Sequence, residues 1–271
     1  MTTVLKLGGE LLEDAAAMQS AAAAIVALAA ADPVVVVHGG GRAIDAELRA
    51  RGEAPRFVDG LRVTDAAALD AVVTVLAGRN NTALVAAIGA AGGRAVGLTG
   101  ADGSIGRCAP AGLFETVSGE KVDLGFVGQP VGSDMSLLRD LLDHGYVPVI
   151  ASVGVDASGA LLNVNADTLA GHLAATIGAD RLIVAGATAG VLDADGGTIA
   201  SLTPGQMDAM TASGAAHSGM IAKLAACRRA LDGGVSEIAI VSGRGVTDFA
   251  SAAGTRIDTA VEPAGRPGSS A

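Results

Sequence analysis

Short aliphatic runs alternate along the chain with longer stretches rich in alanine and leucine. The short runs predict buried strands at residues 3–7, 34–37, 94–98, 147–152, 161–165, 181–185 and 237–241. The longer stretches predict helices at residues 13–31, 42–51, 65–77, 80–91, 134–144, 166–178, 204–212 and 218–232. Turn signals within residues 107–131 indicate an excursion that contains a hairpin. Because strands separated by helices require right-handed crossovers, the pattern predicts an open, mostly parallel sheet.

The composition fits such a sheet. Half of the 271 residues are hydrophobic, whereas 2% are aromatic and tryptophan is absent, so the core is built from small aliphatic side chains. This favours a parallel sheet sandwiched between helices, an α/β fold with three αβα layers. We expect one domain over residues 1–271, in which the Gly/Pro/Ser-rich segment 262–271 forms a flexible tail.

The net charge of −10 predicts a soluble protein that does not bind nucleic acid or anionic membranes. No signal peptide precedes the first strand, and no apolar stretch of about 18 residues is free of Gly, Pro or charge. We therefore expect a cytoplasmic location. Cys108 and Cys227 fit neither a disulfide framework nor a metal cluster.

A lysine stands inside the first strand, directly before two glycines, in Lys6-Leu7-Gly8-Gly9. A buried ammonium group costs several kcal/mol unless it has a partner or faces an anionic ligand. Glycines after it allow backbone N–H groups to approach phosphate oxygens. The same residues are compatible with a lysine that reaches solvent beside an ordinary turn.

A second glycine turn, His38-Gly39-Gly40-Gly41, connects a strand to a helix. Such a turn can bind an anion at the helix N-terminus, although a plain turn explains it equally well. The G-x-G-x-x-G spacing of dinucleotide-binding proteins and the Walker A pattern are both absent. These absences argue against a dehydrogenase and exclude a P-loop kinase.

Six segments together resemble the amino acid kinase family, and closely the N-acetylglutamate kinases. In chain order they are residues 5–10 (LKLGGE), 36–41 (VVHGGG), 60–65 (GLRVTD), 97–100 (GLTG), 163–167 (NVNAD) and 219–223 (GMIAK). The resemblance spans roughly residues 3–256. It implies an amino acid kinase fold, with an acyl-amino-acid lobe over residues 1–175 and a nucleotide lobe over residues 176–258.

The resemblance also implies the reaction. The γ-phosphate of ATP would pass to the side-chain carboxylate of N-acetyl-L-glutamate, giving N-acetylglutamyl 5-phosphate in arginine biosynthesis. Lys6 and Lys223 would hold the phosphoryl group from two sides, and Asp167 would orient both lysines. No base is required, because a carboxylate is already ionised at pH 7. Mg²⁺ would arrive with ATP and be held by phosphates and water, so we expect no metal site made by the protein.

The remaining residues that the resemblance implies bind the two substrates. Backbone N–H groups of the two glycine turns would bind phosphate oxygens, and the second turn would also contact the acceptor; these residues are Gly8, Gly9, Gly40 and Gly41. Arg62 would grip the non-reacting carboxylate of the acceptor, since its planar fork suits bidentate pairing. Asn163 and Asn165 would bind polar groups of the acceptor.

Each of these residues also has an ordinary structural explanation. Arg62 could pair with Asp59 or Asp65, Asp167 could cap the helix that follows it, and Lys223 could be a solvated helix lysine. His38 fits a structural hydrogen bond better than a catalytic base, and the spacing of the other histidines is not that of metal ligands.

Three positions depart from the family pattern. Ser218 replaces a glycine but can still cap the following helix, and Ala222 replaces a frequent proline. Ala187 replaces a common aspartate, and from this we predict an altered affinity for the nucleotide. Residues 65–91 form a helix that packs against its twin in the family, so we expect a homodimer. The family's arginine-inhibited members carry terminal segments that we do not find in this sequence, so we expect insensitivity to arginine.

Two alternative functions stay open at this point. One is a sibling kinase for N-succinylglutamate or N-acetylaminoadipate, because a single methylene gives only about 1–3 kcal/mol of discrimination. The other is a ligand-binding homologue without turnover.

Overall fold

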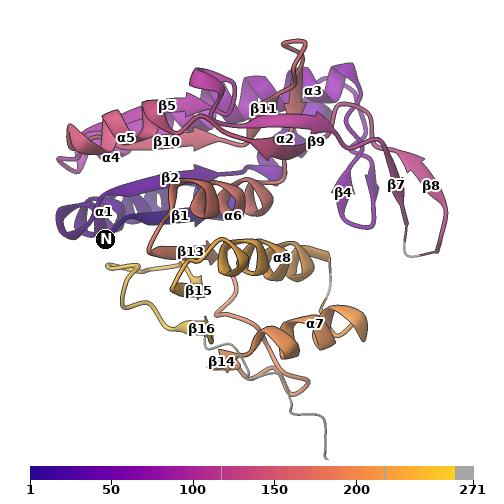
Figure 1. Ribbon diagram of the computed structural model, residues 1–271. Helices are drawn as coiled ribbons and strands as arrows, with labels where there is room; N and C mark the ends of the chain where they lie inside the picture. The colour runs from indigo at the N-terminus through magenta and orange to yellow at the C-terminus, as the bar shows by residue number, and fades with distance from the viewer. Residues whose placement is uncertain (117, 217, 260–271) are drawn as a thin grey trace, which may run out of the picture.

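A computed structural model describes residues 1–116, 118–216 and 218–259, and for Ser218 the backbone alone. The predicted tail at residues 262–271 lies outside the described residues. At the centre is an eight-stranded sheet with the strand order β14-β16-β15-β13-β1-β2-β10-β5 (Figure 1). Its strands are β1 Thr3–Leu7, β2 Val34–His38, β5 Ala95–Thr99, β10 Val147–Ala151, β13 Arg181–Gly186, β14 Ser201–Leu202, β15 Glu237–Ser242 and β16 Gly254–Ile257. All its neighbouring strands are parallel except β15 and β16.

Helices cover both faces of this sheet, which confirms the predicted three-layer architecture. They are α1 Ala15–Ala31, α2 Gly41–Ala50, α3 Ala66–Val73, α4 Asn81–Ala90, α5 Ser136–Asp143, α6 Ala166–Ile177, α7 Pro204–Ala212 and α8 Ser218–Asp232. Helices α1 and α4 pack on one face, in a core built around Leu5, Ile25 and Leu84. Helices α5, α6, α7 and α8 pack on the other face, in a core built around Val4 and Leu169.

The side chains of β1 alternate between these two cores. Leu5 and Leu7 belong to the core with α1, whereas Val4 belongs to the core with α6 and α8. Because successive side chains of a strand point to opposite faces, Lys6 lies on the same face as Val4. The alternation therefore directs the only charged residue of β1 toward helices α6 and α8.

Shorter strands stand outside the central sheet. A four-stranded sheet has the order β12-β11-β6-β9, and two hairpins, β3–β4 and β7–β8, project from the same end of the molecule (Figure 1). Their bounds are β3 Phe57–Val58, β4 Leu61–Arg62, β6 Arg107–Pro110, β7 Leu113–Glu115, β8 Lys121–Asp123, β9 Gly128–Gly132, β11 Val153–Val155 and β12 Leu161–Asn163. The hairpin predicted within residues 107–131 is β7–β8, within the β6–β9 pair.

Helices are present where we predicted them, at residues 65–77 and 80–91, but no break separates them. Helix α3 continues through a π-helical segment, Thr74–Asn80, directly into α4. Gly78 lies inside this segment, at the place where the prediction left a gap between two helices. The wider π-helical turn continues through the glycine without interrupting the helix.

The continuous helix Ala66–Ala90 also has the length and the composition of a membrane span. It has 25 residues and a mean hydropathy of 1.4, and 44% of its most apolar window is buried inside the protein. A core helix of a folded protein meets the same criteria. Half of its length packs on α2, in a core that contains Val72, Val75 and Ile44.

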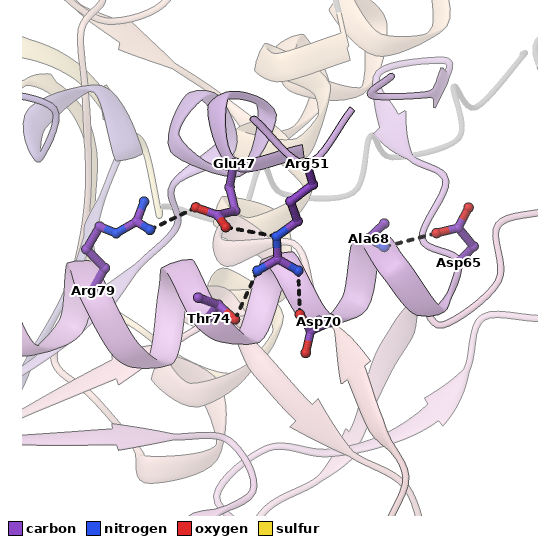
Figure 2. Close-up of polar contacts among 7 residues, drawn as sticks. All are labelled: Glu47, Arg51, Asp65, Ala68, Asp70, Thr74 and Arg79. Carbon is purple, nitrogen blue, oxygen red and sulfur yellow. Dashed lines mark hydrogen bonds and ion pairs between the residues drawn. The ribbon is translucent and has the colours of Figure 1, made fainter. Parts of the chain in front are cut away.

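Polar contacts fix α2 to this helix on the side away from the sheet (Figure 2). Arg51 donates to Glu47 at 2.8 Å and also pairs with Asp70, while Arg79 donates to the other Glu47 oxygen at 2.8 Å. Asp65 caps α3 by accepting a hydrogen bond from the backbone of Ala68 at 2.9 Å. Helix α2 begins at the second glycine turn, so these contacts also fix one wall of the site.

Candidate active site

The predicted site residues converge at the carboxyl ends of β1, β2 and β10, where a parallel sheet ordinarily binds its ligands. A cavity of about 230 Å³ opens there. Its walls are the two glycine turns, the β3–β4 hairpin and the N-terminus of α6. Among its lining residues are Lys6, Gly9, Gly40, Gly41, Arg62, Ser152, Asn163, Asn165 and Asp167.

Two lysines from distant parts of the chain share one buried carboxylate. The Lys6 Nζ atom lies 2.9 Å from Asp167 Oδ1, and Lys223 Nζ lies 3.7 Å from Asp167 Oδ2. The Lys6 and Asp167 side chains are only 6% and 9% exposed, so solvent screens their interaction little. The structure thus brings together the three residues predicted to be catalytic.

The surroundings of Lys223 lower the pKa of its ammonium group. Burial is the main cause and the positive charge of Lys6 the second, whereas Asp167 and Glu10 act in the opposite direction. Lys223 also donates to the Gly219 carbonyl oxygen, one helical turn earlier, at 3.3 Å. The possibility that Lys223 is an ordinary solvated lysine is therefore wrong, because its side chain is 16% exposed and faces the site.

The cap of α6 is Asn165, one of the predicted substrate-binding residues. Its Oδ1 accepts hydrogen bonds from the backbone N–H groups of Asp167 and Thr168 at 2.9 and 3.1 Å. This contradicts the alternative in which Asp167 is the cap, and it leaves the Asp167 carboxylate available to the lysines. Since the cap occupies Asn165 Oδ1, the amide nitrogen is the part of this side chain left for a ligand.

The two glycine turns pack directly against each other. A Cβ atom on Gly9 would stand 2.5 Å from Gly40 Cα, and one on Gly40 would stand 2.6 Å from Asn80 Nδ2 and 2.8 Å from Leu76 Cδ2. Any larger residue at either position would have to displace backbone or buried side chains. Glycine is needed here to let the turns close one side of the cavity.

Arg62 also lines the cavity, at the end of β4. Its Nη2 donates to Asp45 Oδ1 at 2.6 Å and to the Gly41 carbonyl oxygen at 3.1 Å, and its guanidinium stacks 4.7 Å from the Phe57 ring centroid. Its Nη1 is buried and has no hydrogen-bond partner among the residues that the structure describes. A buried donor without a partner is costly, so this atom marks a place for an acceptor group of a ligand.

In the alternative where Arg62 is only structural, we considered an ion pair with Asp65. The structure does not contain that pair. Asp65 caps α3 and pairs with Arg56 instead. The partner of Arg62 is Asp45, on the second turn of α2. No local pattern predicts this pair, because Asp45 and Arg62 are 17 residues apart.

Asn163 is held at the end of β12 by a buried threonine. Its Nδ2 donates to Thr64 Oγ1 at 3.0 Å, and Thr64 donates to the Arg62 carbonyl oxygen at 3.2 Å. Thr64 therefore connects the two predicted substrate-binding side chains. It belongs to the recognised GLRVTD segment, but we assigned it no role.

His38 is structural. It is fully buried at the end of β2, its Nδ1 contacts the Gly39 carbonyl oxygen at 3.2 Å, and its Nε2 contacts Asn81 Nδ2 at 3.1 Å. Burial lowers its pKa to about 4, so the ring is neutral at pH 7. Nδ1 faces an acceptor, the Gly39 carbonyl oxygen, and Nε2 faces a donor, the Asn81 amide nitrogen. The tautomer that carries its proton on Nδ1 therefore satisfies both contacts.

The structure does not describe the side chains of residues 217 and 218, so the predicted cap at Ser218 stays a prediction. The structure does describe the side chain of Glu10, the last residue of the LKLGGE segment, for which the resemblance implied no function. Its Oε1 accepts a hydrogen bond from the backbone of Ala187 at 2.8 Å, so it joins the first glycine turn to the position where the chain departs from the family pattern.

Comparison with known proteins agrees with this geometry. The amino acid kinase family matches residues 1–242. An acetylglutamate kinase from Geotalea uraniireducens is 41% identical over 249 residues, which cover 90% of this chain and 85% of the relative. An acetylglutamate kinase from Symbiobacterium thermophilum is 40% identical over 209 residues, 76% of this chain and 71% of the relative.

Solved structures share the fold. The N-acetylglutamate synthase from Neisseria gonorrhoeae, complexed with coenzyme A and N-acetyl-glutamate, superposes with a TM-score of 0.82 at 23% identity. That similarity covers 96% of this chain and 60% of the synthase. A carbamate kinase from Giardia superposes with a TM-score of 0.68 at 16% identity, over 96% of this chain and 99% of that one. At these identities the likeness concerns the fold alone.

Proposed function

The chain belongs to the amino acid kinase family, and we propose that it transfers the γ-phosphoryl group of ATP to the side-chain carboxylate of N-acetyl-L-glutamate. The product is N-acetylglutamyl 5-phosphate, an intermediate of arginine biosynthesis. The relatives named acetylglutamate kinase support this assignment. The observation that carries it is the pair of lysines on Asp167 beside a cavity that Arg62, with its unpaired Nη1, also lines.

Phosphoryl transfer between two anionic oxygens is mainly a problem of position and charge. A carboxylate oxygen of the acceptor forms a bond to the γ-phosphorus, and the bond to the bridging oxygen of ADP breaks. Lys6 and Lys223 approach the transferred group from β1 and α8 and neutralise its equatorial oxygens. Asp167 holds both ammonium groups in place. Backbone N–H groups of Gly8, Gly9 and the second glycine turn complete the phosphate contacts.

The acceptor binds between Arg62 and Asn163. Arg62 Nη1 donates to the non-reacting carboxylate, while Nη2 stays on Asp45, so the guanidinium is oriented before the substrate arrives. The Asn163 side chain, oriented by Thr64, binds the acylated amide, and the amide nitrogen of Asn165 adds a donor. Arg62 and Lys6 line the same cavity, which suits a substrate that carries two carboxylates.

Mg²⁺ enters with ATP in this proposal. Among the described residues, no three acidic, histidine or cysteine side chains come together in a group that could hold a metal ion. The chain's own carboxylates near the phosphates, Asp167 and Glu10, are engaged with lysine and backbone partners. Phosphate oxygens and water therefore supply the ligands of the ion, and the ion adds positive charge to that of the two lysines.

An assay for acyl phosphate tests the reaction. The protein is incubated with Mg²⁺-ATP and each of N-acetylglutamate, N-succinylglutamate and N-acetylaminoadipate, and the acyl phosphate is trapped with hydroxylamine. We expect the highest kcat/KM with N-acetylglutamate. A higher value with another acceptor would assign a sibling substrate, and no signal with any acceptor would refute the kinase.

The subunit arrangement that we propose is a homodimer formed through the helix of residues 66–90. Every fourth residue along its outer side is small and exposed, at Thr74, Gly78, Thr82 and Ala86. Such a row lets a second helix approach closely. Thr82→Glu should therefore halve the mass measured by sedimentation, whereas Thr176→Glu, at an exposed position on α6, should leave it unchanged. The net charge of −10 favours a soluble protein, and we propose a cytoplasmic location.

A further inference from the structure

We propose that Glu10 is a positioning residue for phosphoryl transfer, which fixes the backbone at Ala187 and places a negative charge near the ammonium group of Lys223. This role rests on the kinase function proposed above. Glu10 belongs to a short 3₁₀ turn, Gly9–Leu11, that follows β1. It is half-buried there, at the edge of the phosphate-binding turn.

The carboxylate of Glu10 bridges the ends of two neighbouring parallel strands. Its Oε1 accepts from the Ala187 backbone N–H at 2.8 Å, directly after β13. Both its oxygens also lie 2.5 Å from the point that a Cβ atom on Gly8 would occupy. A side chain at position 8 would therefore displace the Glu10 carboxylate from this place.

The same carboxylate faces Lys223. A Cβ atom on Gly186 would stand 3.2 Å from Glu10 Oε1 and 3.6 Å from Lys223 Cε, so the two side chains approach each other over this glycine, and the carboxylate acts on the ammonium through its charge and not through a direct ion pair. The other ionisable groups that act on Lys223 are Lys6 from β1 and Asp167 from α6, with the Cys227 thiol one turn along α8. With Glu10 the centre has two ammonium groups and two carboxylates. Without it, two ammonium groups would share Asp167 alone.

This balance keeps Lys223 in its charged form. Burial and Lys6 lower the pKa of Lys223, and Asp167 and Glu10 raise it. An ammonium group that loses its proton can no longer neutralise the transferred phosphoryl group. Glu10 thereby extends the pH range over which Lys223 is active, and its bond to Ala187 fixes the first residue of the loop after β13.

Two substitutions separate these effects. Glu10→Gln keeps an oxygen that can accept from Ala187 but removes the charge. We expect kcat of this variant to fall on the alkaline side at a pH roughly one unit lower than in the wild type, because one nearby opposite charge is lost. The KM for ATP should stay within about twofold of the wild-type value. Glu10→Ala removes both, and we expect the same shift together with a roughly fivefold higher KM for ATP, from the lost hydrogen bond.

Glu13→Gln is the matched control, since Glu13 lies three residues away in an exposed ion pair with Arg42. We expect Glu13→Gln to have the same alkaline pH dependence of kcat and the same KM for ATP as the wild type. A second readout needs no turnover: NMR titration of the Lys223 ammonium in the wild-type protein and in Glu10→Gln, where we expect a lower pKa in the variant.

The outcomes are distinguishable. Coincident pH limbs and NMR titration curves for the wild type and Glu10→Gln would overturn the role of Glu10, even if the wild type is an active kinase. A wild type that forms no acyl phosphate would refute the proposed function, and the NMR titration would still decide whether Glu10 acts on Lys223.

Discussion

The two ends of the cavity are built in different ways. At the phosphoryl end, Lys6, Asp167 and Lys223 stand on β1, α6 and α8, in the centre of the fold, and their charges are paired with one another. At the acceptor end, Arg62 stands on a strand of two residues, in a hairpin that projects from the sheet, and one of its nitrogens has no partner.

This difference separates two tasks. In the function that we propose, the phosphoryl end holds its charges in place before ATP arrives, so little reorganisation is needed during the transfer. The acceptor end leaves a donor unsatisfied, so part of its stabilisation comes only with the ligand. We therefore expect substitutions at the first end to change turnover, and those at the second to change the affinity for the acceptor.

Removal of a phosphoryl-end charge should have the largest effect. We expect Lys223→Ala to lower kcat about 10³-fold, with the KM for N-acetylglutamate within a few-fold of wild type, because it removes charge stabilisation of the transition state. Initial rates from the hydroxylamine assay measure it, and thermal unfolding checks the fold. Unchanged turnover would refute the catalytic role of Lys223 and would favour the ligand-binding alternative.

At the acceptor end, Arg62→Lys should have an intermediate effect on affinity. The substitution keeps a positive charge beside Asp45 but removes the planar fork that presents Nη1 to the ligand. We expect the KM for N-acetylglutamate to rise roughly 10–100-fold, as for the loss of a hydrogen bond to a charged group, with little change in the KM for ATP.

Arg56→Lys is the control for this comparison, since Arg56 precedes the same hairpin and pairs with Asp65 in an exposed position. An equal rise of KM in both variants would mean that the hairpin, and not the Arg62 fork, determines affinity. A fall of kcat alone in Arg62→Lys would contradict the division between the two ends.

The smallest effect concerns the nucleotide. Ala187→Asp restores the residue that the family commonly carries, but here it adds a carboxylate beside Glu10 and near the phosphates. We expect the KM for ATP to rise roughly fivefold, a few tenths to one kcal/mol of repulsion for a partly solvated pair. The rise should be smaller in the Glu10→Gln background. An unchanged KM for ATP in both backgrounds would contradict the hypothesis that position 187 affects nucleotide affinity.

The sequence predicted the central strands and the helices well, because their burial is continuous. Every residue of β1, β2 and β10 is buried, and such runs are visible without any structure. Strands β3, β4 and β14 have two residues each, too few to show a period, and none of them was predicted. One sheet runs through both predicted lobes, so its strand order does not test the boundary between them. The division into two lobes stays a prediction.

The candidate site was predictable where its residues lie in recognisable segments. Lys6, Arg62, Asn163, Asp167 and Lys223 all come together around the cavity or at its mouth. Their supporting partners were not predicted, because each is an ordinary residue whose role appears only in three dimensions. Asp45 is 17 residues from Arg62 and Glu10 is 177 from Ala187, so no local pattern connects them. The roles themselves stay predictions.

The π-helical segment Thr74–Asn80 constrains how this gene can change in length. An α-helix turns about 100° per residue, whereas a π-helical turn takes up about one residue more than an α-helical turn. Deleting one residue within the segment is therefore absorbed by a return to α-helical geometry, which leaves Leu84 and Ile88 in the core under the sheet. Deleting one residue between Asn81 and Leu84 has no such compensation and rotates both side chains out of that core. We therefore expect a one-residue deletion to be tolerated in the π-helical segment more readily than in α4.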